Sequence, residues 1–132
     1  FFSYRGRLPR PVANMVAVTR DYGVYYIEGI KDDNKGINIK TPVNAPVRAV
    51  FEGEVVKVID ISGTFLVVIR HGAYFTAYSN LRAVNVSKGQ KVSTKQAIGV
   101  AGVDSTTGDT EVDFQVYKGD SDMNPRSWLA PN

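Results

Sequence analysis

The chain has 132 residues, the size of a single domain, and its 43% hydrophobic residues are typical of a globular protein. Its net charge of +3 is too small to indicate a nucleic-acid partner. The chain has no cysteine, which excludes disulfides and thiolate zinc sites, and no run of residues approaches the roughly 18 apolar residues of a membrane span. We therefore expect one globular domain that makes no membrane contact through this segment.

The first residues predict an extended linker. Pro9 and Pro11 lie among three arginines, and proline fixes φ and removes an amide donor. We assign residues 1–12 to a linker segment and residues 13–132 to the domain. The sequence starts with phenylalanine rather than methionine, so we expect it to be cut from a longer precursor.

From residue 15 onward the pattern predicts an all-β domain. Short runs rich in Val, Ile, Tyr and Phe alternate with clusters of Gly, Pro, Asn, Asp and Ser, and no helical period persists over ten positions. A single helical turn is expected near residues 124–129. The predicted strands are Met15–Val18, Gly36–Ile39, Val47–Phe51, Gly53–Asp60, Phe65–Arg70, Tyr74–Ser79, Ala97–Val103 and Glu111–Tyr117.

Two kinds of strand are distinguished by their periodicity. Residues 65–69 are apolar without alternation, which predicts a strand covered on both faces. Residues 111–117 alternate instead, with the apolar residues on one side and Glu111 and Asp113 on the other. Residues 34–39 show the same alternation. We therefore predict antiparallel sheets in which these two strands contribute to the polar floor of an open groove.

The residues offer little support for ordinary hydrolytic chemistry. A catalytic zinc ion usually takes three protein ligands, mostly histidine, and this chain has His71 alone. His71 ends an apolar strand before a glycine, where a structural bond to a turn carbonyl is favoured. Neither a Gly-x-Ser-x-Gly elbow nor a phosphate-binding glycine loop is present.

Several segments, in their order and spacing, resemble a known family. They cover the chain from Gly6 to Leu129, and each is weakly specific alone. The sequence resembles LytM-type, lysostaphin-like zinc endopeptidase domains, and among them the EnvC/NlpD-like murein hydrolase activators. The matching segments are Gly6–Val12, Gly36–Ile39, Ala45–Val50, Gly53–Val56, Val68–Gly72, Tyr78–Leu81, Val86–Val92, Ile98–Gly99, Phe114–Val116, Asn124–Pro125 and Trp128–Leu129.

The resemblance implies that the catalytic apparatus is missing. Active members carry a His-x-Gly-x-Asp motif for two zinc ligands, a later His-x-His motif for a catalytic histidine and the third ligand, and another catalytic histidine. The first motif maps onto residues 34–38, the second onto residues 111–113, and the remaining histidine onto Asn80. Carboxamides are poor zinc ligands, and Asn80 cannot act as a general acid or base near neutral pH. We expect no enzymatic activity, no metal and no cofactor.

The implied function is regulatory. Activators of this kind bind a cell-wall amidase or another murein hydrolase and relieve its autoinhibition during cell division and daughter-cell separation, in the periplasm or cell envelope. The implied fold is a mainly β, LytM-like barrel-sandwich with an open groove. The residues that the resemblance places in the partner-binding groove are Asn34, Lys35, Asn38, Tyr78, Asn80, Glu111, Asp113 and Tyr117, with the two tyrosines at its rim.

Three alternatives remain open at the level of sequence. The same groove could bind peptidoglycan itself without acting on a hydrolase. An enzyme could hold a hard cation through Asn34, Asn38, Glu111 and Asp113. The stretch from Val86 to Gly99 also resembles biotinyl and lipoyl carrier domains, although neither methionine of the chain lies near a suitable lysine.

Overall fold

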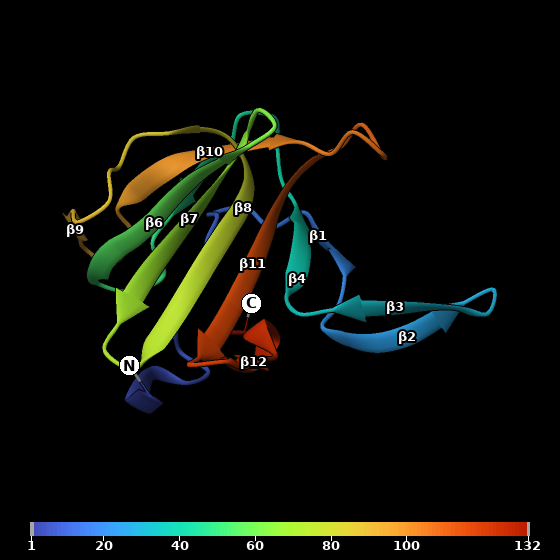
Figure 1. Ribbon diagram of the computed structural model, residues 1–132, viewed down its shortest axis with the longest axis horizontal. Coiled ribbons are helices and arrows are strands. Elements are labelled where there is room, and N and C mark those ends of the chain that lie inside the picture. Colours follow the sequence, from blue (N-terminus) through green and yellow to red (C-terminus); the bar gives the residue numbers. More distant parts are fainter. Residues whose placement is uncertain (1, 132) are drawn as a thin grey trace.

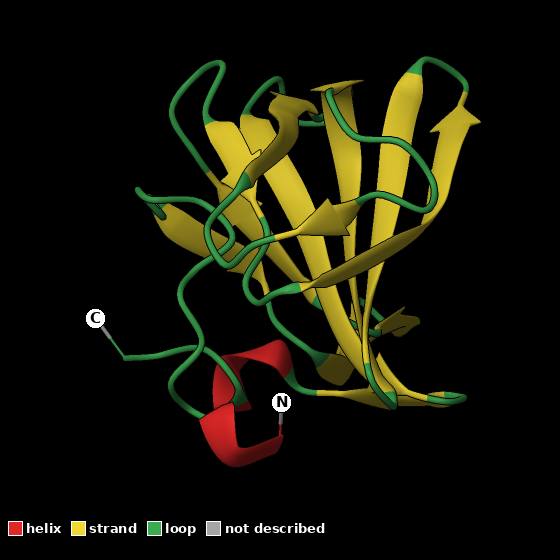
Figure 2. Cartoon of the chain, turned by 90° about the vertical axis from the view of Figure 1, so that its left-hand side faces the viewer, coloured by secondary structure: helices red, strands yellow, loops and turns green. Residues whose placement is uncertain are grey.

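The computed structural model describes residues 2–131, and nearly all of its regular structure is β-strand (Figure 1). Two short 3-10 helices, η1 (Phe2–Tyr4) and η2 (Pro125–Ser127), lie at the same end of the strands (Figure 2). The strands of this part of the chain are β1 (Ala17–Arg20), β2 (Gly23–Ile27), β3 (Ile30–Asn34), β4 (Ile37–Lys40), β5 (Pro46–Arg48), β6 (Gly53–Ile61), β7 (Thr64–His71), β8 (Tyr74–Val84), β9 (Lys91–Val92), β10 (Ala97–Val103), β11 (Thr110–Lys118) and β12 (Ser121–Met123). The predicted mainly β fold is confirmed.

Ten of these strands form one antiparallel sheet. The strands of this sheet are arranged in the order β1-β4-β11-β10-β8-β7-β6-β9. In addition, β5 pairs with β10, and β12 pairs with β11. Figure 1 shows β6, β7, β8 and β11 side by side as long strands. β11 pairs with β10 at its first residues and with β8 along the rest of its length, which places β11 at the centre of the sheet.

The core lies against one face of this sheet. Val112, Phe114 and Val116 of β11 are fully buried there, as their alternation predicted. In β7, Val67 and Ile69 join the core cluster, whereas Val68 is only 4% exposed but lies outside it. The strand is therefore covered on both faces at Val68, whereas Leu66 on the same outer face is only partly buried.

Both ends of the chain close the core. Leu8 and Val12 are fully buried, and Trp128 is 2% exposed. The Gly6 and Leu8 amides both donate to the Trp128 carbonyl, and Leu8 forms a parallel bridge with Leu129. The boundary between a linker and a domain near residue 12 stays a prediction, although Leu8 already packs in the core.

The pattern did not predict the second, two-stranded sheet, formed by β2 and β3. The two strands continue the β1–β4 pair with an almost unchanged register, Gly23 opposite Asn34 and Ile27 opposite Ile30. They leave the main sheet where β12 pairs with β11 at residues 116–118 and where β11 itself ends at Lys118, so most of β3 has no strand to pair with at that edge. Figure 1 shows the hairpin projecting from the body. We call residues 23–34 the arm.

Within residues 2–131, no helix has the length and apolar character required to cross a membrane.

Candidate functional site

Strand pairing aligns polar side chains from four strands on the face of the sheet opposite the core. Arg20 of β1 pairs with Asn38 of β4, Asn38 pairs with Asp113 of β11, and Asp113 pairs with Ser79 of β8. Residues that are paired across antiparallel strands point to the same side. We call this the open face. It contains the floor positions predicted from the alternation of β4 and β11.

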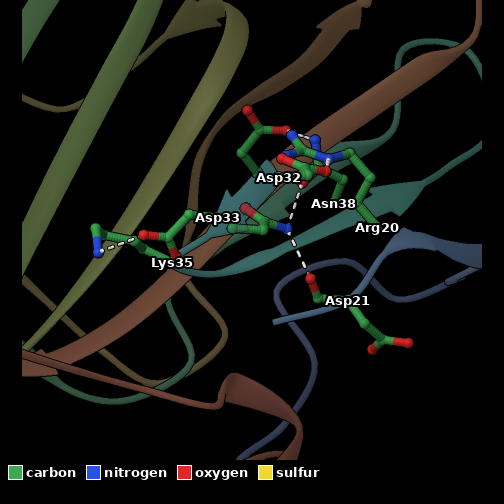
Figure 3. A network of polar contacts seen from close by, with 8 residues as sticks. Arg20, Asp21, Asp32, Asp33, Lys35 and Asn38 are labelled. Atoms are coloured by element: carbon green, nitrogen blue, oxygen red, sulfur yellow. Dashed lines mark hydrogen bonds and ion pairs between the residues drawn. The ribbon is translucent and has the colours of Figure 1, made fainter. Parts of the chain in front are cut away.

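A chain of hydrogen bonds joins the predicted residues on the open face. The Asn34 amide nitrogen donates to the Asp21 carbonyl at 3.0 Å and to Asn38 Oδ1 at 3.2 Å (Figure 3). The Asn38 amide nitrogen donates in turn to Asp113 Oδ1 at 2.9 Å. The structure thus brings Asn34, Asn38 and Asp113 together, with each carboxamide oriented by its neighbour.

The carboxylates here are crowded and poorly hydrated. Burial, followed by the charges of Glu111 and Asp104, raises the pKa of Asp113 from 3.8 to about 6, against the opposing effect of Arg20. Glu111 is only 3% exposed, and its pKa is also raised, mainly by burial. Lys40 pairs with Asp109 at 3.6 Å at the margin of the cluster. Carboxylates outnumber cations in this part of the open face.

The other predicted residues occupy three different settings. Asn80 adopts a positive φ of 65°, and its amide nitrogen donates to the Glu111 carbonyl at 2.9 Å, so it joins the cluster. The Lys35 Nζ lies 3.4 Å from a carboxylate oxygen of Asp33 and 3.8 Å from one of Asp122. Tyr117 lies on the open face, where its ring stacks on Phe75.

The prediction that Tyr78 contacts a partner at the rim is wrong. Tyr78 is fully buried on the core face, where its ring packs against Phe114. Its hydroxyl accepts a hydrogen bond from the Val50 amide at 3.1 Å, so the core satisfies its polar group. Alternation along β8 places Phe75 and Ala77, rather than Tyr78, on the open face.

His71 has the structural role expected from its position. It is 6% exposed, and burial lowers its pKa from 6.5 to about 4. In the neutral ring, Nδ1 donates to the Glu52 carbonyl at 2.7 Å, so Nε2 accepts from the Thr76 hydroxyl at 2.8 Å. Thr76 accepts from the Tyr78 hydroxyl at 2.8 Å. The Val50 amide and the Glu52 carbonyl fix the direction of this chain because neither can reverse its role.

The residues at the five family positions do not fit the zinc ion of active LytM-type domains. A catalytic zinc site takes histidine nitrogens and carboxylate oxygens. Here two of the ligand positions carry Asn34 and Asn38, whose amide groups bond to one another and to Asp113. In the described residues 2–131, no three His, Cys, Asp or Glu side chains are grouped to hold a metal.

Sequence reasoning missed residues at the base of the arm. Arg20 Nη2 lies 2.5 Å from Asp32 Oδ1, and Nε donates to Asp32 Oδ2 at 3.3 Å (Figure 3). Thr19 and Asp104 also border the cluster. A hydrogen bond with Thr19 lowers the pKa of Glu111, and the charge of Asp104 raises it. One signal could have revealed the arm: Glu28-Gly29 separates the β-forming stretch Val24–Ile27 from Ile30, and a two-residue loop with glycine is typical of a hairpin.

Comparison with known proteins identifies the fold and family of this arrangement. Residues 32–125 match the model of Peptidase family M23. The cell division protein DipM of Caulobacter vibrioides is 28% identical over 93 residues, which are 68% of this chain and 15% of DipM. The peptidoglycan DD-endopeptidase ShyB of Vibrio cholerae is 32% identical over 85 residues, 63% of this chain and 20% of ShyB. This chain therefore spans a fifth or less of these curated relatives.

Solved structures show the same fold. A chain of the SpoIIQ–SpoIIIAH pore-forming complex superimposes with a TM-score of 0.82 at 23% identity, covering 96% of this chain and 92% of that one. A zinc-containing peptidase from Vibrio cholerae superimposes with a TM-score of 0.75 at 26% identity, covering 96% of this chain and 40% of that one. The fold thus occurs both in a protein complex and in a zinc-containing peptidase.

Proposed function

This chain belongs to Peptidase family M23, and on that premise we propose that it is a non-catalytic member that binds a cell-wall amidase, or another murein hydrolase, through its open face and stimulates that enzyme. The binding region is centred on Asn38 and Asp113. The site of action is the periplasm or cell envelope, during cell division or daughter-cell separation.

One observation carries this proposal. At the positions where the family resemblance places zinc ligands, the side chains of Asn34, Asn38 and Asp113 bond to each other in a continuous chain. Such a network satisfies the polar groups without a metal and holds them in one arrangement. A preorganised polar surface supports binding of a macromolecule, because few groups need to be ordered when the partner arrives.

The relatives support the same context. DipM is named a cell division protein, and ShyB is named a peptidoglycan DD-endopeptidase. The fold also occurs in the SpoIIQ–SpoIIIAH complex, where two proteins assemble. These likenesses favour an envelope location and a protein partner.

The test is dye release from labelled murein sacculi, with each purified amidase of the same organism and the purified chain. We expect the chain alone to release no dye and to increase release by at least one amidase. Asp113→Ala should weaken stimulation and Asp120→Ala should not, because Asp120 is an exposed aspartate in the turn after β11. Dye release by the chain alone, or failure to bind and stimulate any of the amidases, contradicts the proposal.

A passive peptidoglycan-binding module is the second candidate. It is favoured by the Tyr117 and Phe75 rings, which lie on the open face with centroids 5.2 Å apart and planes within 13°. Retention of the chain on sacculi, lost in Tyr117→Ala and without any effect on hydrolases, would support it over the activator.

A further inference from the structure

The arm exposes more apolar surface than its own two strands can cover. Ile27 and Ile30 are 59% and 71% exposed, and Val24 and Tyr26 are 53% and 69% exposed. No residue of the arm belongs to the core cluster. A two-stranded hairpin gains little stability in water by itself. The fold therefore does not explain these side chains, whereas covering them would be favourable.

The arm is nevertheless preorganised. Its turn is the two-residue pair Glu28-Gly29, both at positive φ, which matches the twist of the flanking strands. At its base, Arg20 binds Asp32 through two nitrogens, and the Tyr22 hydroxyl bonds to the Asp122 carboxylate. A rigid arm presents its side chains to a partner at a lower entropic cost than a mobile loop.

Strand pairing determines which apolar residues lie on the side of the open face. Asn34 bonds to Asn38 on the open face, and alternation puts Asp32 and Ile30 on the same side of β3 as Asn34. Ile27 pairs with Ile30 across the hairpin and shares that side. Val24 and Tyr26 point to the opposite side. The tip of the arm therefore extends the open face with an isoleucine pair.

Charges further along the same side, toward the open face, select the chemistry of what binds there. Asp32, Glu111 and Asp113 lie on this side, against Arg20, which Asp32 already engages, and Lys40, which pairs with Asp109. A second copy would bring two acidic clusters together, which is unfavourable. A glycan chain offers no aliphatic surface for the isoleucines. A polypeptide segment with apolar side chains beside Lys or Arg complements both features.

We propose that the Ile27–Ile30 tip of the arm, together with the acidic open face, binds a segment of the partner hydrolase that carries apolar residues next to basic ones. This inference rests on the proposed function and names the chemistry of its partner. The isoleucine pair seats the apolar residues of the segment, and the partly exposed Asp113 carboxylate receives a cation.

The experiment measures binding of each purified amidase of the same organism to four forms of the purified chain by biolayer interferometry. The forms are wild type, Ile27→Ser with Ile30→Ser, Val24→Ser with Tyr26→Ser, and Asp113→Ala. The two double variants remove apolar side chains of similar exposure from opposite sides of one hairpin. Since these residues lie outside the core, circular dichroism and thermal unfolding should match the wild type.

We expect the Ile27→Ser, Ile30→Ser variant to raise Kd about tenfold or more and the Val24→Ser, Tyr26→Ser variant to change it less than about twofold. Raising NaCl from about 0.05 to 0.5 M should weaken wild-type binding, because salt screens the acidic face. Equal effects of the two double variants, or binding that is insensitive to salt, overturn the inference.

The remaining outcomes separate the two proposals. If Asp113→Ala weakens binding but the isoleucine variant does not, the arm plays no part and the proposed function stands. If wild type binds none of the amidases, the proposed function fails and the partner named here fails with it. If wild type sediments as a dimer that Ile27→Ser with Ile30→Ser dissociates, a second copy occupies the arm and the inference is wrong.

Discussion

Replacing Asp113 by asparagine should stabilise the protein at neutral pH. The carboxylate is ionised in a crowded, partly buried position, whereas an asparagine there keeps an oxygen that accepts the hydrogen bond from Asn38. A folded pKa of about 6, compared with 3.8 in the unfolded chain, corresponds to about 3 kcal/mol at full ionisation. We therefore expect Asp113→Asn to raise the free energy of unfolding by up to about 3 kcal/mol at pH 7.5.

The sign of this effect depends on pH in a defined window. Between pH 3.8 and about 6 the folded wild type holds a proton that the unfolded chain has released, so wild-type stability from this group is lost as pH rises. The advantage of Asp113→Asn should be absent below pH 4 and complete above pH 7. His71 titrates in the same range in both proteins, so its contribution cancels in the difference.

Urea unfolding followed by Trp128 fluorescence measures this difference, since Trp128 is the single tryptophan and is 2% exposed. Asp120→Asn is the matched control, because it removes the same charge from an exposed turn. The reasoning is refuted if Asp113→Asn destabilises the protein at pH 7.5, or if Asp120→Asn produces the same pH-dependent gain.

Three further predictions concern the rest of the fold. In the Asp113→Asn background, stability supplied by neutral His71 should be present above pH 6.5 and fall by about 3 kcal/mol toward pH 4, and an NMR titration that placed its pKa near 6.5 would contradict this. Phe114→Ala should cost about 3 to 5 kcal/mol in urea unfolding, because the ring is fully buried; a loss below about 1 kcal/mol would count against its place in the core. Gly36→Ala should cost about 1 to 3 kcal/mol by thermal unfolding, because a Cβ there would collide with the Phe114 carbonyl, and an unchanged midpoint would show that the strands can move apart.

Alternation predicted the faces of β11 because its apolar and polar residues occupy opposite faces of one regular strand. Val112 and Phe114 are in the core and Asp113 is on the open face, as expected. The family resemblance misplaced Tyr78, which is fully buried and whose hydroxyl accepts a hydrogen bond from the Val50 amide 28 positions away. A sequence pattern cannot show that a distant backbone group will satisfy a buried tyrosine.

The arm was missed for a different reason. Its apolar residues are exposed, and hydrophobic periodicity predicts only those strands whose apolar residues face a core. The arm leaves the sheet where β11 ends and β12 pairs with it, and both of those strands lie more than 75 positions later in the chain. The family resemblance located Asn34 and Asn38, but the pairing of Arg20 with Asp32 follows only from the register of the hairpin.

The position of β12 along β11 has a consequence for how such domains diverge. Because β12 already pairs with that end of β11, the main sheet loses no backbone pairing if residues 23–34 are shortened, lengthened or substituted. The pairing of the main sheet and the exposed apolar side chains of the arm thus come from separate stretches of polypeptide. A graft of this hairpin onto another member of the fold should transfer the exposed isoleucine pair without requiring any repacking of the recipient.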